Sequence, residues 1–150
     1  MTEINLQAGA APNAVLSSSC RSDAPLIQGE NAQFHFEELQ LEDQTGDRVV
    51  IRRFGDHYRV GSTAQQSGVF HIFATTPLLF IVQETVGGRS YGYVVLQRED
   101  ETVKLLDYQQ LFPDSPGSAM VNGLDDLAMA ARRAALENKG AAVFRLTAIK

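Results

Sequence analysis

Two of the three histidines in this sequence fall in one charged stretch, residues 34–60, which reads FHFEELQLEDQTGDRVVIRRFGDHYRV. A carboxylate that holds one imidazole, with a second imidazole beside it, is an arrangement used in general acid–base catalysis and in metal binding. His35, Asp56 and His57 supply these groups. A hairpin turn at Gly46 would carry His35 towards the other two at one end of a sheet. The alternative is that both imidazoles face water.

The arginines of the same stretch form a second candidate site. A tight turn at Gly55 and Asp56 sets Arg52 directly opposite Arg59, and like charges in that position are unfavourable unless an anion lies nearby. A carboxylate such as Glu37, or free solvation, would satisfy the pair. Otherwise the two guanidinium groups bind an anionic ligand or an acidic partner. With no catalytic residue and no metal ligand assigned, the candidate ligand-binding residues are Arg52, Arg59, His35 and His57.

The other charges of this stretch are predicted to fix the register of the strands. A turn centred on Thr45 and Gly46 places Asp43 opposite Arg48, and the same register places Glu38 opposite Arg53. Opposite charges across a strand pair are worth about 0.2–1 kcal/mol each. These charges therefore have a structural explanation that needs no ligand.

The third histidine is predicted to lie away from the others. With Thr63 opposite Val69, His57 faces Thr75, which is about 13 Å along the strand from His71. A zinc site of three histidines is therefore not expected, and no cofactor is predicted. The sequence also lacks the G-x-S-x-G, H-E-x-x-H, paired C-x-x-C and phosphate-loop motifs whose geometry would support an enzyme.

Runs rich in β-forming residues recur at short intervals, separated by Gly, Asp and Pro turn signals, which is typical of an antiparallel meander. Leu78 to Val82 are apolar at every position, so their strand should be buried on both faces. A turn at Gly87 and Gly88 would set Phe80 opposite Val95 in the next strand. The predicted strands are residues 33–43, 47–54, 57–63, 69–75, 78–85, 90–97 and 102–108.

One helix and one more strand follow the meander. Residues 123–138 are predicted to be helical, with an apolar stripe rich in alanine, and residues 141–149 to form the last strand. The fold class is therefore α+β: an antiparallel β-meander of seven to eight strands, as a curved sheet or a partly closed barrel, with one C-terminal helix followed by a final strand. A sandwich of two sheets is the alternative.

The composition is that of one globular domain. A chain of 150 residues with 44% hydrophobic and 21% charged residues can bury a core without disulfides or metals. The formal charge of −5 argues against general binding to nucleic acid, which needs a concentrated cationic surface. No apolar run approaches the roughly 20 residues of a membrane helix. We expect a flexible leader over residues 1–30 and a single β-rich domain over residues 31–150.

The leader carries two resemblances. VLSSSC, residues 15–20, resembles the end of a bacterial lipoprotein signal, in which the cysteine is acylated, although Leu16 lies four places before Cys20 and not the usual three. Such a resemblance implies that Cys20 anchors the protein to a membrane. The uncharged composition rich in Ser, Asn and Ala is also similar to that of type III secretion leaders. Otherwise the leader is a flexible tail.

We expect a small, non-enzymatic binding or interaction protein of bacterial type. Its order of elements is similar to that of small lipoproteins of bacteria, without a shared motif. The site would be the concave face of the sheet or the surface around Arg52 and Arg59, and the partner an unknown protein or a small anionic ligand. The alternatives are a hydrolase-like enzyme that uses His35, Asp56 and His57, or a secreted effector. The compartment stays open: cytoplasmic, exported, or periplasmic or lipid-anchored with a longer leader.

Overall fold

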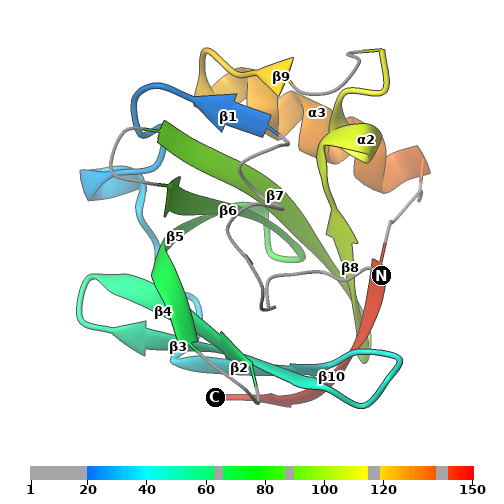
Figure 1. Ribbon diagram of the computed structural model, residues 1–150. Coiled ribbons are helices and arrows are strands. Elements are labelled where there is room, and N and C mark those ends of the chain that lie inside the picture. The colour runs from blue at the N-terminus through cyan, green and yellow to red at the C-terminus, as the bar shows by residue number, and fades with distance from the viewer. Residues whose placement is uncertain (1–19, 63–65, 87–89, 115–118, 138–141) are drawn as a thin grey trace.

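The protein is a closed antiparallel β-barrel with one long helix on its outside (Figure 1). The computed structural model describes residues 20–62, 66–86, 90–114, 119–137 and 142–150. Its strands are β1 (Cys20–Ser22), β2 (Glu38–Glu42), β3 (Arg48–Phe54), β4 (His57–Ser62), β5 (Gln66–Thr76), β6 (Leu79–Val86), β7 (Ser90–Glu99), β8 (Thr102–Leu106), β9 (Ala119–Met120) and β10 (Ala142–Ile149). Its helices are η1 (Gly29–Asn31), α2 (Tyr108–Leu111) and α3 (Leu124–Glu137).

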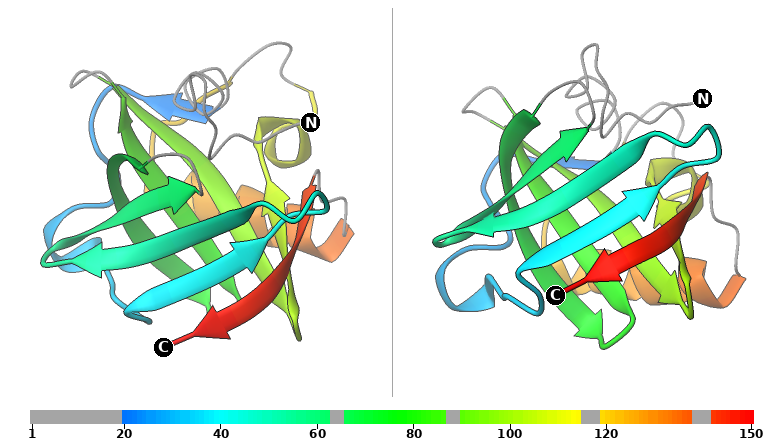
Figure 2. Two further views of the ribbon diagram at one scale, coloured as in Figure 1. Left: turned by 60° about the horizontal axis from the view of Figure 1, so that its bottom comes forward. Right: turned by 90° about the horizontal axis from the view of Figure 1, so that it is seen from below.

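The strands from β2 to β8 form a meander, and β10 closes it. Each of these strands pairs with the next, and β10 pairs with β8 on one side and with β2 on the other, so eight strands complete the ring (Figure 2). The predicted α+β fold is confirmed, and the barrel is fully closed. Closure leaves these strands without a free edge, because each is paired on both sides.

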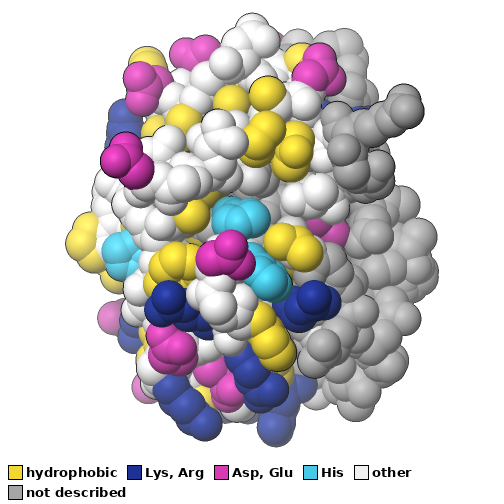
Figure 3. Space-filling view, turned by 90° about the vertical axis from the view of Figure 1, so that its left-hand side faces the viewer, with side chains coloured by type: hydrophobic (Ala, Val, Ile, Leu, Met, Phe, Trp, Pro, Cys, Tyr) yellow, Lys and Arg dark blue, Asp and Glu magenta, His cyan; other side chains and the backbone are white. Residues whose placement is uncertain are grey.

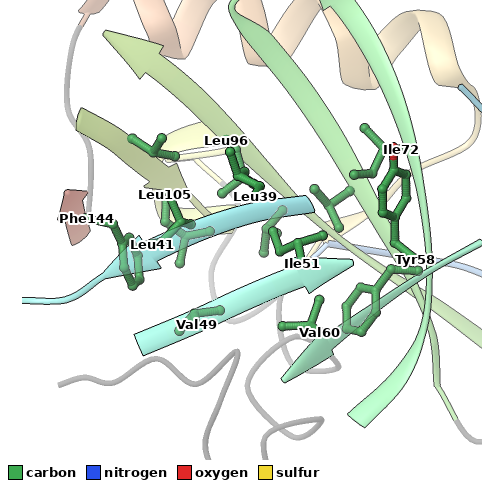
Figure 4. Packing of buried hydrophobic residues seen from close by; sticks show 14 of the residues in the cluster. Leu39, Leu41, Val49, Ile51, Tyr58, Val60, Ile72, Leu96, Leu105 and Phe144 are labelled. Carbon is green, nitrogen blue, oxygen red and sulfur yellow. The ribbon is translucent and has the colours of Figure 1, made fainter. Parts of the chain in front are cut away.

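The interior of the barrel is filled by alternate side chains of all eight strands. Leu39 and Leu41 of β2 point into it, as do Val49 and Ile51 of β3, and these four side chains are buried (Figure 4). Because side chains alternate along a strand, the residues between them point outward. The positions of the apolar residues in β2 and β3 therefore also determine which residues of these strands face outward.

A second core lies between the barrel and α3. Ile81 of β6 and Val95 of β7 point away from the barrel interior and pack in one cluster with Leu127 and Ala131 of α3. Strands β6 and β7 are therefore buried on both faces, which explains their continuous apolar sequence. The alanines of α3 let the helix approach the sheet closely. None of the described helices has the length and apolar character needed to span a membrane.

Residues 20–30, which the sequence placed in the leader, take part in the fold. β1 pairs with β7, with Cys20 opposite Tyr93, and Ile27 is buried in the second core. The Cys20 side chain is fully buried as well. Acylation at Cys20 would require this thiol to leave the core, so its burial does not support the lipid anchor that the lipoprotein resemblance implies. The leader stays a prediction for residues 1–19, which lie outside the described residues.

The Cys20 thiol is expected to be unreactive in the folded protein. Burial raises its pKa to about 12, and the negative charge of Asp107 adds to the shift. Because the thiolate is the nucleophile, reaction with a disulfide reagent at mildly alkaline pH should be roughly 10²–10³-fold slower in the native protein than in denaturant. Stopped-flow absorbance with the two samples gives this ratio. Equal reaction rates in the native and denatured samples would show that β1 is not paired with β7 in the folded protein.

Two hairpins differ by one residue from the predicted register. Asp43 accepts hydrogen bonds from the backbone N–H groups of Thr45 and Asp47, so it closes the turn and does not face Arg48. The pairs across this hairpin are instead Glu42 with Arg48 and Glu38 with Arg52, and not Glu38 with Arg53 as predicted. The turn accommodates one more residue than expected because Gly46, with φ of +92°, adopts the left-handed conformation.

The hairpin between β6 and β7 is shifted in the same way. Phe80 lies opposite Leu96, and not opposite Val95 as a two-residue turn would require. Val86 and Ser90 are the last pair before residues 87–89, which lie outside the described residues. The connection therefore has three residues. Since paired residues share a face, the shift places Phe80 and Leu96 together on the interior side.

Candidate functional site

The outer face of β10, β2, β3 and β4 is the side of the barrel away from α3 (Figure 2). Its side chains alternate with those that fill the interior. Five cationic and two acidic side chains lie in neighbouring positions on it, which leaves a formal charge of +3 on a chain whose net charge is −5. We call this surface the arginine face; its charged residues are Arg48, Arg52, Arg59, Arg145, Lys150, Glu38 and Glu42.

Arg52 is paired with a carboxylate, and the carboxylate is Glu38. The Arg52 Nε–H group donates to Glu38 Oε1 over 2.8 Å. Lys150 Nζ lies 3.7 Å from the other oxygen of the same carboxylate. Hydrogen bonds from Gln40 and then from Arg52 hold the pKa of Glu38 below its usual value. Glu37, which the sequence offered for this role, contacts Arg53 instead, at 3.2 Å. Glu38 is therefore ionised and forms ion pairs with two cations, Arg52 and Lys150.

Arg59 lies directly opposite Arg52, as predicted, and it has no anionic partner among the described residues. The side chain is exposed, and its guanidinium carbon lies 5.8 Å from the centre of the Phe54 ring. Phe54 is itself 41% exposed. A cation over an aromatic face is held by a weak attraction that leaves its N–H donors free. Arg59 and Phe54 thus present a charged and an apolar group together at the surface.

The predicted contact between Asp56 and His57 is present. His57 Nδ1 lies 2.9 Å from Asp56 Oδ1, and this hydrogen bond lowers the pKa of Asp56. The carboxylate can only accept, so Nδ1 carries the proton and Nε2 of a neutral His57 keeps its lone pair. This is the arrangement by which a carboxylate fixes the tautomer of a catalytic or metal-binding histidine.

His71 lies across from His57, and the prediction that it would lie about 13 Å away was wrong. Tyr58 of β4 pairs with Phe70 of β5, so the next position along β5 brings His71 opposite His57. Figure 3 shows two histidine side chains next to each other beside a carboxylate, above a group of arginine and lysine side chains. The predicted register failed because β5 begins at Gln66, inside a segment that was read as a loop.

Two nitrogens of these imidazoles have no hydrogen-bond partner in the part of the chain that the structure describes. His57 Nε2 and His71 Nδ1 are buried, and neither forms a hydrogen bond to any described residue. Burial lowers the pKa of His71, and the nearby His57 lowers it further. Both effects favour a neutral ring at neutral pH. Buried polar atoms are almost always paired in folded proteins, so two unpaired nitrogens in one place require an explanation.

His35 does not join this pair. It is exposed, its Nε2 lies 2.9 Å from Gln33 Oε1, and its ring centre lies 6.0 Å from that of Phe80. Neither Asp56 nor His57 is among its hydrogen-bond or ring partners. The three-residue arrangement of the hydrolase-like alternative is therefore not formed, and only its Asp56–His57 contact is present.

No protein-family model, curated protein or solved structure matches the chain. A function for this chain is therefore inferred from its own residues.

One small cavity lies in the described part of the barrel interior. A cavity between Phe36, Phe80 and Ile149 has a volume of about 20 Å³ and is lined almost entirely by apolar atoms. That volume suits a single water molecule, whereas pockets for organic ligands measure about 300–1,000 Å³. This part of the interior is therefore a packed core.

Proposed function

We propose that the protein is a non-enzymatic binding protein that recognises an acidic protein partner through the arginine face. The observation that carries this proposal is Arg59, an exposed arginine without an anionic partner among the described residues, placed opposite Arg52. A carboxylate on a partner would satisfy Arg59 and relieve its repulsion with Arg52.

The shape and charge of the face favour a protein over a small anion. Its cations lie on β3 and β4 and, on the other side of β2, on β10 and at Lys150 just after it, so they are spread over strands about 5 Å apart. A small anion needs convergent donors, whereas an acidic protein surface can meet separated cations one by one. Phe54 supplies an exposed aromatic group beside Arg59, and aromatic residues and arginine dominate binding energy at protein interfaces.

The proposal is tested with charge reversals and a fluorescent oligoglutamate peptide as the acidic probe. Arg59→Glu should weaken binding about 30-fold, because it removes one attraction and adds one repulsion of roughly 1 kcal/mol each. Arg52→Glu should act in the same direction. Fluorescence anisotropy measures both, and the affinity of the wild-type protein should fall as sodium chloride is added.

Arg132→Glu is the matched control. Arg132 is an exposed residue of α3, on the opposite side of the barrel, and its reversal changes the net charge by the same amount. Binding of the peptide to this variant should stay within about twofold of wild type, because screening weakens interactions beyond roughly 10 Å. An equal loss in Arg132→Glu and Arg59→Glu would mean that net charge alone attracts the peptide, and the proposal would fail.

A further inference from the structure

We propose that His57 and His71 form a binding site for a divalent first-row transition-metal ion. The geometry that points to it is a pair of imidazoles on neighbouring strands, each with one buried nitrogen, His57 Nε2 and His71 Nδ1, that no described residue hydrogen-bonds. A bound ion between the two rings would give both nitrogens a partner. Imidazole nitrogen is a good ligand for Zn²⁺, Cu²⁺ and Ni²⁺.

The backbone of the barrel brings the two rings together. His57 is the first residue of β4, and the pairing of Tyr58 with Phe70 fixes β4 against β5 at this point. Side chains in directly opposite positions of antiparallel strands have Cβ atoms about 4.5–5.5 Å apart. Two imidazoles at this separation can turn their nitrogens towards one ion, with each nitrogen about 2.0–2.1 Å from it.

Asp56 prepares His57 for this role. Its carboxylate accepts the Nδ1 proton of His57 at 2.9 Å, which leaves the Nε2 lone pair free for a metal. A carboxylate behind a ligating histidine fixes the orientation of the ring and makes it a stronger donor. Asp56 is therefore a positioning residue, since it acts through His57.

The site has two protein ligands and open positions. Within the described parts of the chain, no group of three or more His, Cys, Asp or Glu side chains is placed to hold a metal ion. Water or a group from another molecule would complete the coordination, as at catalytic and regulatory metal sites with an open position. Affinity should follow the general order for nitrogen ligands, with Cu²⁺ bound more tightly than Ni²⁺ or Zn²⁺. This inference does not depend on the arginine face.

Isothermal titration of the full chain with Zn²⁺ and with Cu²⁺ tests the site, and the third histidine of the chain provides a matched control. His57→Ala and His71→Ala should each weaken binding at least tenfold, whereas His35→Ala should bind as wild type does, because His35 lies outside the pair. Asp56→Asn should weaken binding by roughly 10–100-fold while the two ligands remain. Circular dichroism of each variant verifies that the barrel is folded.

Electron paramagnetic resonance of the wild-type protein loaded with one equivalent of Cu²⁺ tests, without any variant, whether two imidazoles bind the metal. The spectrum should show coupling to two imidazole nitrogens. A single nitrogen, an equal loss of affinity in His35→Ala and His57→Ala, or no binding of either metal would overturn the inference.

Discussion

Replacing Tyr58 with alanine should lower the free energy of unfolding by about 3–5 kcal/mol, the range found when large aromatic side chains are removed from a core. Tyr58 is fully buried in the barrel interior. Its ring centre lies 4.9 Å from that of Phe36 and 5.6 Å from that of Phe34, and its hydroxyl donates to the Phe36 carbonyl at 2.7 Å. The side chain therefore fixes the segment before β2 onto β4. Urea denaturation followed by circular dichroism measures the loss.

Tyr58→Phe separates packing from hydrogen bonding. It keeps the ring but leaves the Phe36 carbonyl without its donor, so the cost should be about 1–2 kcal/mol. Tyr58 lies between His57 and Arg59 in β4, and its inward packing is what turns these two neighbours outward. A loss below about 1 kcal/mol in Tyr58→Ala would show that the ring is not part of the core and that this strand is misplaced.

Replacing Glu84 with glutamine should make the protein more stable than wild type at alkaline pH. Glu84 of β6 pairs with Phe70 of β5, so it points into the barrel, where it is 1% exposed. Its Oε1 atom has no hydrogen-bond partner among the described residues. Burial raises the pKa of this carboxyl to about 8, because the charged form loses its hydration inside the barrel.

The sign of this effect follows from proton binding. Between the usual carboxyl pKa near 4.5 and the folded value near 8, the folded protein holds a proton on Glu84 that the unfolded chain has released. Stability contributed by the neutral carboxyl is therefore complete below about pH 4.5 and is lost as the pH rises to about 8. Glu84→Gln has no such proton, so its stability relative to wild type should rise by about 3–5 kcal/mol between pH 5 and pH 9.

Urea denaturation of both proteins at the two ends of this pH range gives the difference directly. At acid pH both carry a neutral side chain at position 84, so this end of the range serves as the control. A difference in stability that does not change with pH would mean that the Glu84 carboxyl is not buried in the folded protein.

The fold was largely predictable because hydrophobic pattern and turn residues act locally. The run around Phe80 and Ile81 is apolar at both alternating positions, and it lies between two cores as this pattern requires. The helix predicted over residues 123–138 is α3, Leu124–Glu137. β1 was missed, because three residues beginning at Cys20 form a strand only through their pairing with β7. A strand that forms only through such a tertiary contact has no recognisable pattern in its own sequence.

The candidate site was predictable only in part, because it depends on register. Arg52 and Arg59 meet as expected, since Gly55 fixes a tight turn between them. His71 was missed because the start of β5, Gln66 to Gly68, contains Ser67 and Gly68, residue types that are common in turns. Because the strand extends over these three residues, Gly61 pairs with Gln66 and His71 comes to lie opposite His57.

The most direct test of the proposed role is to find where an acidic partner touches the barrel. Uniformly ¹⁵N-labelled protein is titrated with the oligoglutamate peptide, and the arginine side-chain Nε resonances are followed together with the amides. We predict the largest shifts at Arg59 and Arg52 and in β2, β3 and β4, with Arg132 of α3 unaffected. Shifts centred on α3, or spread evenly over the surface, would contradict the assignment of the arginine face as the binding surface.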